Sequence, residues 1–354
     1  MAAIGSAKDL WSRVGLMAPG PLSGTSGPDL YNGTDGDDVY AGGAGDDTIN
    51  GLDGDDALAG DAGADRIDGG RGRDRMNGGA DADTLLGGKH DDVLSISTGA
   101  DSLDGGEGVD ILNAKKLDFG VVGNARSTGA GLPSTPANSL TLGNGDVQQI
   151  FGVEDFIGSR FADKFYAGDA AAHLKGGKGN DTLAGRIGND ELYGDAGNDA
   201  LDGGNGNDSL FGGKGNDNIL GGLGSDTLFG GVGNDTMEAA NAFDEVHGGD
   251  GNDLINIHEG GFSNQLLFGD AGADTFHYGV TGGTMQDFTP GEDVCDLRVI
   301  LADEEDPTFE DLQSMMTSVS GGTLLKFDFN TAKNFEYWFI GVDPGEFTAA
   351  DFLI

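Results

Sequence analysis

The sequence predicts an all-β protein in which two arrays of nine-residue units coil into stacked parallel strands, followed by a small β-rich C-terminal cap with one short helix. Three observations support this fold class. An Asp returns every nine residues, as in GGKGNDTLAGRIGNDELYG (176–194). An apolar residue follows two places after almost every such Asp, and Gly makes up 68 of the 354 residues. A fixed short period of this kind is the sequence signature of repeat folds.

The composition is strongly acidic and poor in apolar residues. Asp and Glu number 61 against 19 Lys and Arg, the formal net charge is −42, and 37% of residues are hydrophobic. This charge argues against nucleic acid and membrane insertion, and it makes a cation the natural partner. The single cysteine, Cys295, excludes an internal disulfide framework. No apolar run is long enough to span a membrane, and the opening stretch MAAIGSAKDLWSRVGLMAPG lacks the pattern of a cleavable signal peptide.

The period divides the chain into five segments. An N-terminal segment or cap (1–32) precedes a first array of nine units (33–113) and an inserted segment (114–157). The second array (158–277) holds eleven units, an apparent three-residue insertion at 257–259, and two more units. The C-terminal cap covers 278–354. Of the 22 units, 20 carry Asp at the sixth position, and the exceptions are Ala172 and Gln265.

Each unit is expected to form a turn followed by a very short strand. Glycines at the first, second and fourth positions permit positive φ angles, and Asn or Asp at the fifth position is expected to tolerate them as well. The eighth position is apolar and is predicted to point inward. Two units would then form one coil, with strands of successive coils about 4.8 Å apart.

This geometry places the sixth-position Asp side chains of every second unit in a column along each edge. Such columns repel unless a cation lies between successive turns. All-oxygen ligation by flexible acidic turns suits Ca²⁺, whereas Mg²⁺ prefers a stricter octahedron. Calcium binding would then supply much of the folding free energy.

The units resemble the GGxGxDxUx nonapeptide of the RTX (repeats-in-toxin) calcium-binding proteins, over about 198 residues. The resemblance implies a right-handed parallel β-roll, with multiple Ca²⁺ ions held between adjacent turns by sixth-position Asp carboxylates and backbone oxygens. The candidate metal ligands are Asp38, Asp47, Asp56, Asp65, Asp74, Asp92, Asp110, Asp181, Asp190, Asp199, Asp208, Asp217, Asp226, Asp235 and Asp253.

Some units depart from the family pattern. Asp81 and His90 replace the fourth-position Gly, and unit 96–104 has lost its opening glycines. Such departures weaken the expectation of a site at six Asp residues, of which only Asp92 is kept as a candidate: Asp83, Asp92, Asp101, Asp163, Asp244 and Asp274. The sequence shows neither the twelve-residue spacing of an EF-hand nor the lysine of a P-loop.

The segments outside the arrays have weaker patterns. Residues 7–17 could form a short amphipathic helix over the first coil, and the insertion is predicted to hold strands at 116–122 and 139–142 around a loop at 127–138. In the cap we expect a closing segment at 285–297 that resembles the end of many RTX rolls. A helix within 306–319, with Asp306 as N-cap, and strands at 323–329 and 334–342 are predicted to follow.

The end of the chain resembles the C-terminal end of type I secretion substrates, in which an acidic residue precedes terminal apolar ones. A buried final strand is the alternative interpretation. The resemblance implies export through the type I secretion machinery of a Gram-negative bacterium and folding outside the cell, in the medium or at the cell surface, where calcium is abundant. The residues concerned are Asp351, Phe352, Leu353 and Ile354.

The sequence contains no motif that indicates catalysis. HExxH and GxSxG are both missing, only about 32 residues precede the first array, and the five histidines are scattered. We therefore predict a protein that is not an enzyme, with a calcium-binding fragment of an enzyme system as the alternative.

Ninth-position residues on one side of the second array form an aromatic series, Tyr193, Phe211 and Phe229, between Lys175 and His247. Coverage by the insertion or the cap is the ordinary interpretation, and an intermolecular contact is the alternative. The predicted function is an extracellular matrix, surface-layer or adhesion component that could self-assemble. The alternative is a module that binds or modifies polysaccharide.

Overall fold

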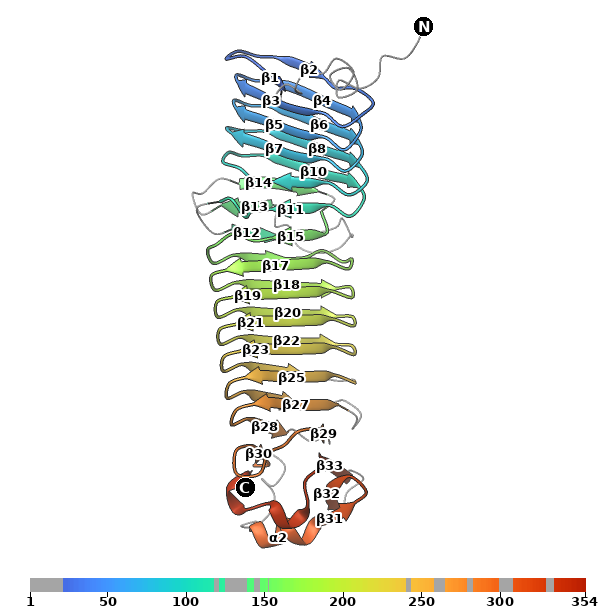
Figure 1. The fold of residues 1–354 in the computed structure, drawn as a ribbon, viewed down its shortest axis with the longest axis vertical. Coiled ribbons are helices and arrows are strands. Elements are labelled where there is room, and N and C mark those ends of the chain that lie inside the picture. The colour runs from blue at the N-terminus through green and yellow to red at the C-terminus, as the bar shows by residue number, and fades with distance from the viewer. Residues whose placement is uncertain are drawn as a thin grey trace, which may run out of the picture. The chain divides into compact units, whose positions relative to one another are not determined.

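The computed structural model describes residues 22–117, 121–124, 139–142, 147–151, 153–239, 243–257, 265–278, 283–298, 308–328 and 334–354. The chain forms two compact units, Met1–Gly168 and Asp169–Ile354. Figure 1 shows parallel strands following one another within each unit. The described part contains no helix long and apolar enough to cross a membrane.

The first unit is built from short strands that alternate between two parallel sheets. Each strand pairs with the strand of the second nonapeptide after its own, so that Leu58 lies opposite Met76 and Ile49 opposite Ile67. This register confirms that two nonapeptides make one coil. The strands are β1 (Leu22–Ser23), β2 (Leu30–Asn32), β3 (Val39–Ala44), β4 (Thr48–Asp53), β5 (Ala57–Ala62), β6 (Arg66–Arg71), β7 (Arg75–Ala80), β8 (Thr84–Lys89), β9 (Val93–Ser95), β10 (Ser102–Glu107) and β11 (Ile111–Asn113).

The core of the first unit is one side chain wide on each strand. The eighth-position residues are buried, and Ile49, Leu85 and Leu112 are completely inaccessible to solvent. Their neighbours at the seventh and ninth positions point outward, as the alternation of a strand requires. The predicted core is therefore confirmed.

The roll begins one unit before Gly33. Residues 24–32 (GTSGPDLYN) form a further turn and strand, with Asp29 at the sixth position and Tyr31 at the eighth. The Tyr31 ring stacks on Tyr40, with ring centroids 4.0 Å apart. The array predicted from the sequence begins at Gly33 and misses this unit. The predicted helix at 7–17 lies outside the described residues.

The insertion adds strands to one sheet. These are β12 (Val121–Asn124), β13 (Ser139–Leu142) and β14 (Val147–Phe151), while β15 (Asp155–Ile157) pairs with β11 and β16 (Lys164–Tyr166) pairs with β12. β13 is antiparallel to both neighbours, and β14 is parallel to β10. The strand predicted at 139–142 is confirmed. The other begins at Val121 rather than 116, since Lys115 and Lys116 lie in a turn. The loop predicted at 127–138 is outside the described residues.

The second unit continues the same pattern. Leu192 lies opposite Leu210, whereas Phe268 rather than Gln265 lies opposite His247, which confirms the three-residue insertion. The strands are β17 (His173–Lys178), β18 (Thr182–Ile187), β19 (Glu191–Ala196), β20 (Ala200–Asn205), β21 (Ser209–Lys214), β22 (Asn218–Leu223), β23 (Thr227–Val232), β24 (Thr236–Ala239), β25 (Glu245–Asp250), β26 (Leu254–Ile257), β27 (Leu266–Ala271) and β28 (Thr275–Tyr278).

The cap closes the second roll with a small mixed structure. β29 (Thr284–Met285) pairs with β27 and with β33 (Asn334–Ile340), while β30 (Val294–Asp296) pairs with β28 and with the final strand β34 (Phe352–Leu353). β31 (Met316–Val319), β32 (Gly322–Asp328) and β33 form an antiparallel meander. Two 3₁₀ turns, η1 (Pro344–Glu346) and η2 (Ala349–Asp351), precede β34. The two strands predicted for the cap are confirmed.

The predicted helix is shorter than the sequence suggested. α2 spans Phe309–Met315, and its N-cap is Thr308, whose side chain forms a capping box with Asp311. The prediction of Asp306 as N-cap is wrong, because Thr308 and Asp311 satisfy each other's backbone amides. The helix ends before Met316, where β31 pairs with β32.

Candidate calcium-binding turns

The turns depend on positive φ angles at their second and fourth positions. In the unit that begins at Gly212, these are Gly213 (φ 105°) and Gly215 (φ 127°). The non-Gly residues with positive φ in the described part all occupy one of these two positions, and they are Leu52, Asp61, Asp81, His90, Arg186, Asp195 and Asp270. Asp81 and His90 therefore preserve the turn conformation at the cost of some backbone strain.

Fifth-position residues do not take the left-handed conformation that we expected of them. Asn180, Asn189 and Asn198 have no positive φ. Their side chains instead accept hydrogen bonds from the next turn on the same edge, as where Asn198 N–H donates to Asn180 Oδ1 at 3.0 Å. The fifth position thus links successive turns along their outer edge. The expectation was wrong because the positive φ angles at the second and fourth positions are sufficient to reverse the direction of the chain.

The sixth-position Asp side chains lie in buried columns inside the turns. Asp217, for example, is 2% exposed. In each column the main-chain N–H of one Asp donates to Oδ1 of the Asp in the next turn, as from Asp199 to Asp217 and from Asp217 to Asp235, each at 2.7 Å. One carboxylate oxygen is thereby fixed, and the orientation of the other is fixed with it.

In most turns that the structure describes, the second carboxylate oxygen has no hydrogen-bond partner. A buried polar atom without a partner costs about 1–3 kcal/mol, and more when it is charged. The same carboxylate oxygen is orphaned, that is, without a hydrogen-bond partner, in successive turns. This is the arrangement expected of a ligand oriented toward a cation. The Oδ2 atoms concerned belong to Asp47, Asp56, Asp65, Asp74, Asp83, Asp92, Asp110, Asp190, Asp199, Asp208, Asp217, Asp226, Asp235, Asp253 and Asp274.

In many turns a carbonyl oxygen of the next turn lies close to the carboxylate oxygen that lacks a partner. A Cβ atom added to Gly194 would lie 2.5 Å from Asp199 Oδ2 and 2.6 Å from the carbonyl oxygen of Gly212 in the next turn. A Cβ atom added to Gly60 would lie similarly close to Asp65 Oδ2 and 2.6 Å from the Gly78 carbonyl oxygen. The first-position Gly thus leaves open a small space between a carboxylate and a carbonyl oxygen. These hard oxygen donors fit Ca²⁺.

Main-chain oxygens are needed to complete such a site. In the described part, no group of three or more His, Cys, Asp or Glu side chains is placed to hold a metal ion. Carboxylates of successive turns would therefore have to act together with turn carbonyls, as the resemblance to RTX repeats implies.

Several of the buried carboxyls are protonated more readily than exposed ones. Burial raises the pKa of Asp83, Asp92, Asp199, Asp226 and Asp274 to about 7, and repulsion from neighbouring carboxylates adds to the rise. The same causes raise the pKa of Asp56 to about 6. A bound cation would remove this penalty, because an opposite charge favours the ionised form.

The hydrogen bonds of the Asp side chains divide them into possible metal ligands and others differently from the sequence pattern. Asp83 and Asp274, left out of the candidate set, have the same orphaned oxygen as the candidates. Asp38, a candidate, has its Oδ2 occupied by the N–H and hydroxyl of Thr34, at 2.6 and 3.1 Å. Asp181 lies buried in the same column as Asp199. The residue at the second position of each turn could have indicated these differences, but that residue was considered only as glycine or non-glycine.

The aromatic series of the second roll is a continuous stack. The ring of Phe211 lies 4.8 Å from Tyr193 and 5.1 Å from Phe229, with interplanar angles of 9° and 3°. His247 continues the stack at 4.8 Å from Phe229, and Phe268, which sequence reasoning had not included, follows at 4.3 Å. The ring faces are turned toward each other, so the ring edges are what this ladder presents outward.

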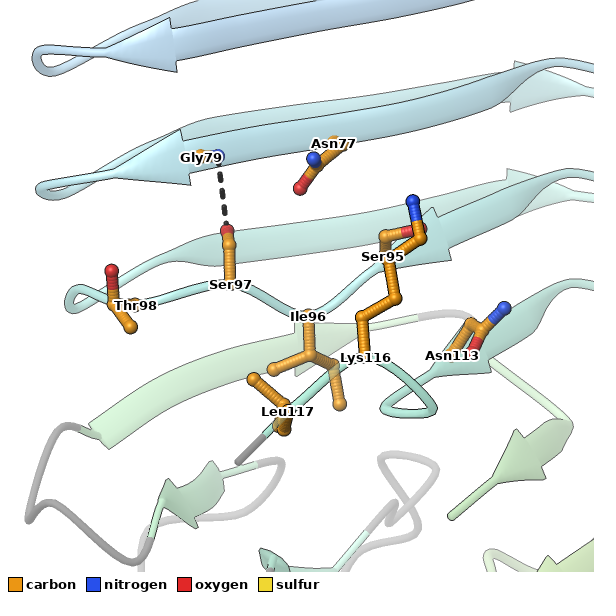
Figure 2. Close-up of a pocket in the computed structure, with 9 residues that line it drawn as sticks. All are labelled: Asn77, Gly79, Ser95, Ile96, Ser97, Thr98, Asn113, Lys116 and Leu117. Atoms are coloured by element: carbon orange, nitrogen blue, oxygen red, sulfur yellow. Dashed lines mark hydrogen bonds between the residues drawn. The ribbon is translucent and has the colours of Figure 1, made fainter. Parts of the chain in front are cut away.

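A small pocket with a mixed polar and apolar lining lies where the first array departs from its repeat. Its volume is about 250 Å³, and Figure 2 shows that the side chains of Ile96 and Leu117 lie close together. The Ser97 hydroxyl accepts the N–H of Gly79 at 3.1 Å. Unit 96–104, which lacks the opening glycines, contributes Ile96, Ser97 and Thr98 to the lining. It is lined by Asn77, Gly79, Ser95, Ile96, Ser97, Thr98, Asn113, Lys116 and Leu117.

The chain belongs to the family of RTX calcium-binding nonapeptide repeats. The family model matches residues 32–115, 166–256 and 259–280 in overlapping segments, which is more than half of the chain. Repeats of this family bind calcium ions in multiple sites and are typical of secreted proteins, and the repeat domain is generally not catalytic. The predicted family, fold class and metal are therefore confirmed.

Comparisons with curated proteins and with solved structures do not extend this family assignment. No curated protein matches the chain. Among solved structures, the chain is similar to the extracellular lipase LipA from Serratia marcescens at 15% identity and a TM-score of 0.15. The match covers 93% of this chain and 40% of the lipase chain. A similarity at this level supports no argument about fold or activity.

Proposed function

We propose that this chain is a secreted β-roll that folds when calcium enters its turns outside the cell, and that it serves there as a non-catalytic matrix, surface-layer or adhesion component. The single observation that supports this is the column of buried, oriented and orphaned Asp oxygens. Without a cation each oxygen opposes folding, whereas with calcium each becomes a ligand.

The test is light scattering and circular dichroism on purified protein in chelator and then in millimolar Ca²⁺. We expect an expanded, largely unfolded roll in chelator and a compact β-rich one in calcium, while Mg²⁺ at the same concentration should have a much weaker effect. Identical size and spectrum with and without calcium would contradict the proposal.

The type I secretion residues fit this proposal if export precedes folding. In the folded protein, Asp351 is buried, and its carboxylate accepts the Gly291 N–H at 2.7 Å, while Phe352 packs in β34. Asp351 and Phe352 are therefore accessible to the secretion machinery only in an unfolded chain, whereas Leu353 and Ile354 are exposed in the folded one. Deletion of 351–354 should abolish export from cells that express the matching transporter. Export that continues unchanged would contradict this assignment.

Self-assembly through the aromatic ladder is the finer part of the proposal. The side chains of Tyr193, Phe211 and Phe229 are half-buried and form one stripe. Replacing all three by Ser should abolish assemblies seen by light scattering in calcium while leaving a folded monomer. Assembly that persists in the triple variant would exclude the ladder as the contact.

Polysaccharide binding is the second candidate function, and the pocket of the first roll favours it. Its lining offers amides and hydroxyls together with the exposed Lys116, a combination that suits an acidic sugar. The aromatic ladder does not favour this function, because sugars stack on ring faces and these faces are occupied. Binding of oligouronates in calcium should fall in Lys116→Gln but not in Lys115→Gln. A screen for lyase or epimerase activity would test for a modifying role.

A further inference from the structure

Not all turns of the roll are built alike. In five described turns the second position holds Ser or Thr rather than Gly or another residue with positive φ. At Thr34, the main-chain N–H donates to Asp38 Oδ2 at 2.6 Å and the hydroxyl reaches the same oxygen at 3.1 Å. Thr25 and Asp29 repeat this pair at 2.5 and 2.9 Å. The carboxylate oxygen that is orphaned elsewhere is here held by two protein donors.

The same arrangement recurs elsewhere. Ser159 N–H donates to Asp163 Oδ2 at 2.6 Å, its hydroxyl lies 3.2 Å from Oδ1, and Val121 N–H donates to Oδ1 at 2.6 Å. In the cap, Thr289 N–H donates to Asp293 Oδ2 at 2.7 Å. The Ser97 hydroxyl lies 3.3 Å from Asp101 Oδ2.

The backbone explains why the donors become available. Strands that lead into Gly-type turns run through the third turn position and are six residues long, as β3 and β21 are. Strands that lead into Ser or Thr turns stop at the ninth position, as β2, β9 and β15 do after three residues. None of these Ser and Thr residues has positive φ. The N–H groups of Thr25, Thr34, Ser159 and Thr289 donate instead to the carboxylate of their own turn.

A third donor completes the first turns. The Tyr31 hydroxyl hydrogen-bonds to the Asp38 carboxylate, and burial together with Asp38 raises the pKa of Tyr31 to about 12, so the phenol keeps its proton. A Cβ atom added to Gly24 would lie 2.8 Å from the Tyr40 hydroxyl and 2.7 Å from Asp29 Oδ2. Tyrosine hydroxyls thus lie beside the carboxylates of both turns at the start of the first roll.

We propose that Ser or Thr at the second turn position takes the place of calcium, so that these turns close without metal at ends of the calcium-binding columns. This inference rests on the proposed calcium binding by the Gly-type turns. The positions agree with it: Thr25 and Thr34 open the first roll, Ser97 lies near the end of the first array, Ser159 opens the second array, and Thr289 follows its last unit.

The arrangement has a physical reason. An ion between turns needs oxygens from two successive turns, and an end turn has a neighbour on one side only. A Gly-type turn at an end could share an ion with one neighbouring turn only, so its buried carboxylate charge would be compensated less completely, which is costly. Donors from within the same turn remove that charge penalty without requiring a neighbour.

Native mass spectrometry in calcium resolves the number of ions per chain and can test this. Thr34→Gly combined with Tyr31→Phe removes both hydroxyl donors around Asp38, and glycine permits the positive φ that would turn the N–H of residue 34 away from the carboxylate. This double variant should bind one ion more than wild type. The matched control, Thr34→Ser with Tyr31→Phe, restores the hydroxyl and should bind the wild-type number. Independently, Asp38→Asn should leave the ion count unchanged, whereas Asp74→Asn in a Gly-type turn should lower it.

The outcomes separate this inference from the proposed function. Equal counts in the Thr34→Gly and Thr34→Ser double variants, or an equal loss of ions in Asp38→Asn and Asp74→Asn, would overturn the inference while calcium binding by wild type stands. A wild-type chain that binds no calcium would overturn both.

Discussion

The second roll and the cap that closes it belong to one compact unit but are stabilised in different ways. The roll has one aliphatic side chain per strand inside, such as Leu210, and rows of buried carboxylates at its edges. The cap has a cluster of aromatic rings, in which Phe339 lies 5.2 Å from Phe288 and 4.9 Å from Phe347. From this difference we expect the roll to need an external ligand for stability, whereas the cap carries its own core.

Removal of calcium should separate the two regions most clearly. In chelator, amide protection from hydrogen exchange should fall by about 100-fold or more across β18–β26, as expected when ions held well above their dissociation constants are lost. Protection in β32 and β33 should change far less, because their packing involves aromatic rings and no Gly-type turn. Equal loss of protection in both regions would show that the cap depends on the roll for its stability.

Replacement of one carboxylate should weaken the roll without affecting the cap. In Asp217→Asn, the amide oxygen can still accept the Asp199 N–H, but an NH₂ group replaces the oxygen near the Gly230 carbonyl. The calcium concentration at the folding midpoint should rise by roughly 10- to 100-fold, the range seen when the surroundings of a metal are altered. Asp250→Asn, at an exposed turn position, is the matched control and should leave the midpoint unchanged. A shared shift would point to net charge rather than ligation.

Acid should partly replace calcium in the roll. Burial raises the pKa of Asp199 and Asp226 to about 7, so the metal-free folded roll binds more protons than the unfolded chain between about pH 4 and about pH 7. Its stability is therefore greatest at low pH and is lost as pH rises through the raised pKa. In chelator, acidification from about pH 7.5 to about pH 5 should increase the β signal in circular dichroism. A signal that falls on acidification would contradict this sign.

Much of this organisation could be predicted from the sequence, because the period fixes register. Once Asp recurs every nine residues, the core at Leu192 and Leu210 and the two-unit coil follow directly. The turns were harder to predict, since their chemistry depends on whether the second-position N–H lies in the ladder or faces the carboxylate. That choice follows from φ, which a glycine count does not reveal at Leu52 or Thr34. The helix boundary at Thr308 was missed for a similar reason, because a local capping box outweighed the Asp-Pro signal.

The smallest expected effect concerns the ladder, which sets one face of the roll apart from the other. Phe211 stacks on two rings, whereas Leu220, at the equivalent position of the opposite sheet, has no ring neighbour at Asp202 or Glu238. Each stacked aromatic pair contributes about 0.5–1.5 kcal/mol beyond area burial. Phe211→Ser should therefore lower the free energy of unfolding in calcium more than Leu220→Ser, by about 1–3 kcal/mol for two pairs. A double-mutant cycle with Phe229 measures the coupling free energy between the two rings. A coupling free energy of zero would mean that the rings are neighbours without stabilising each other.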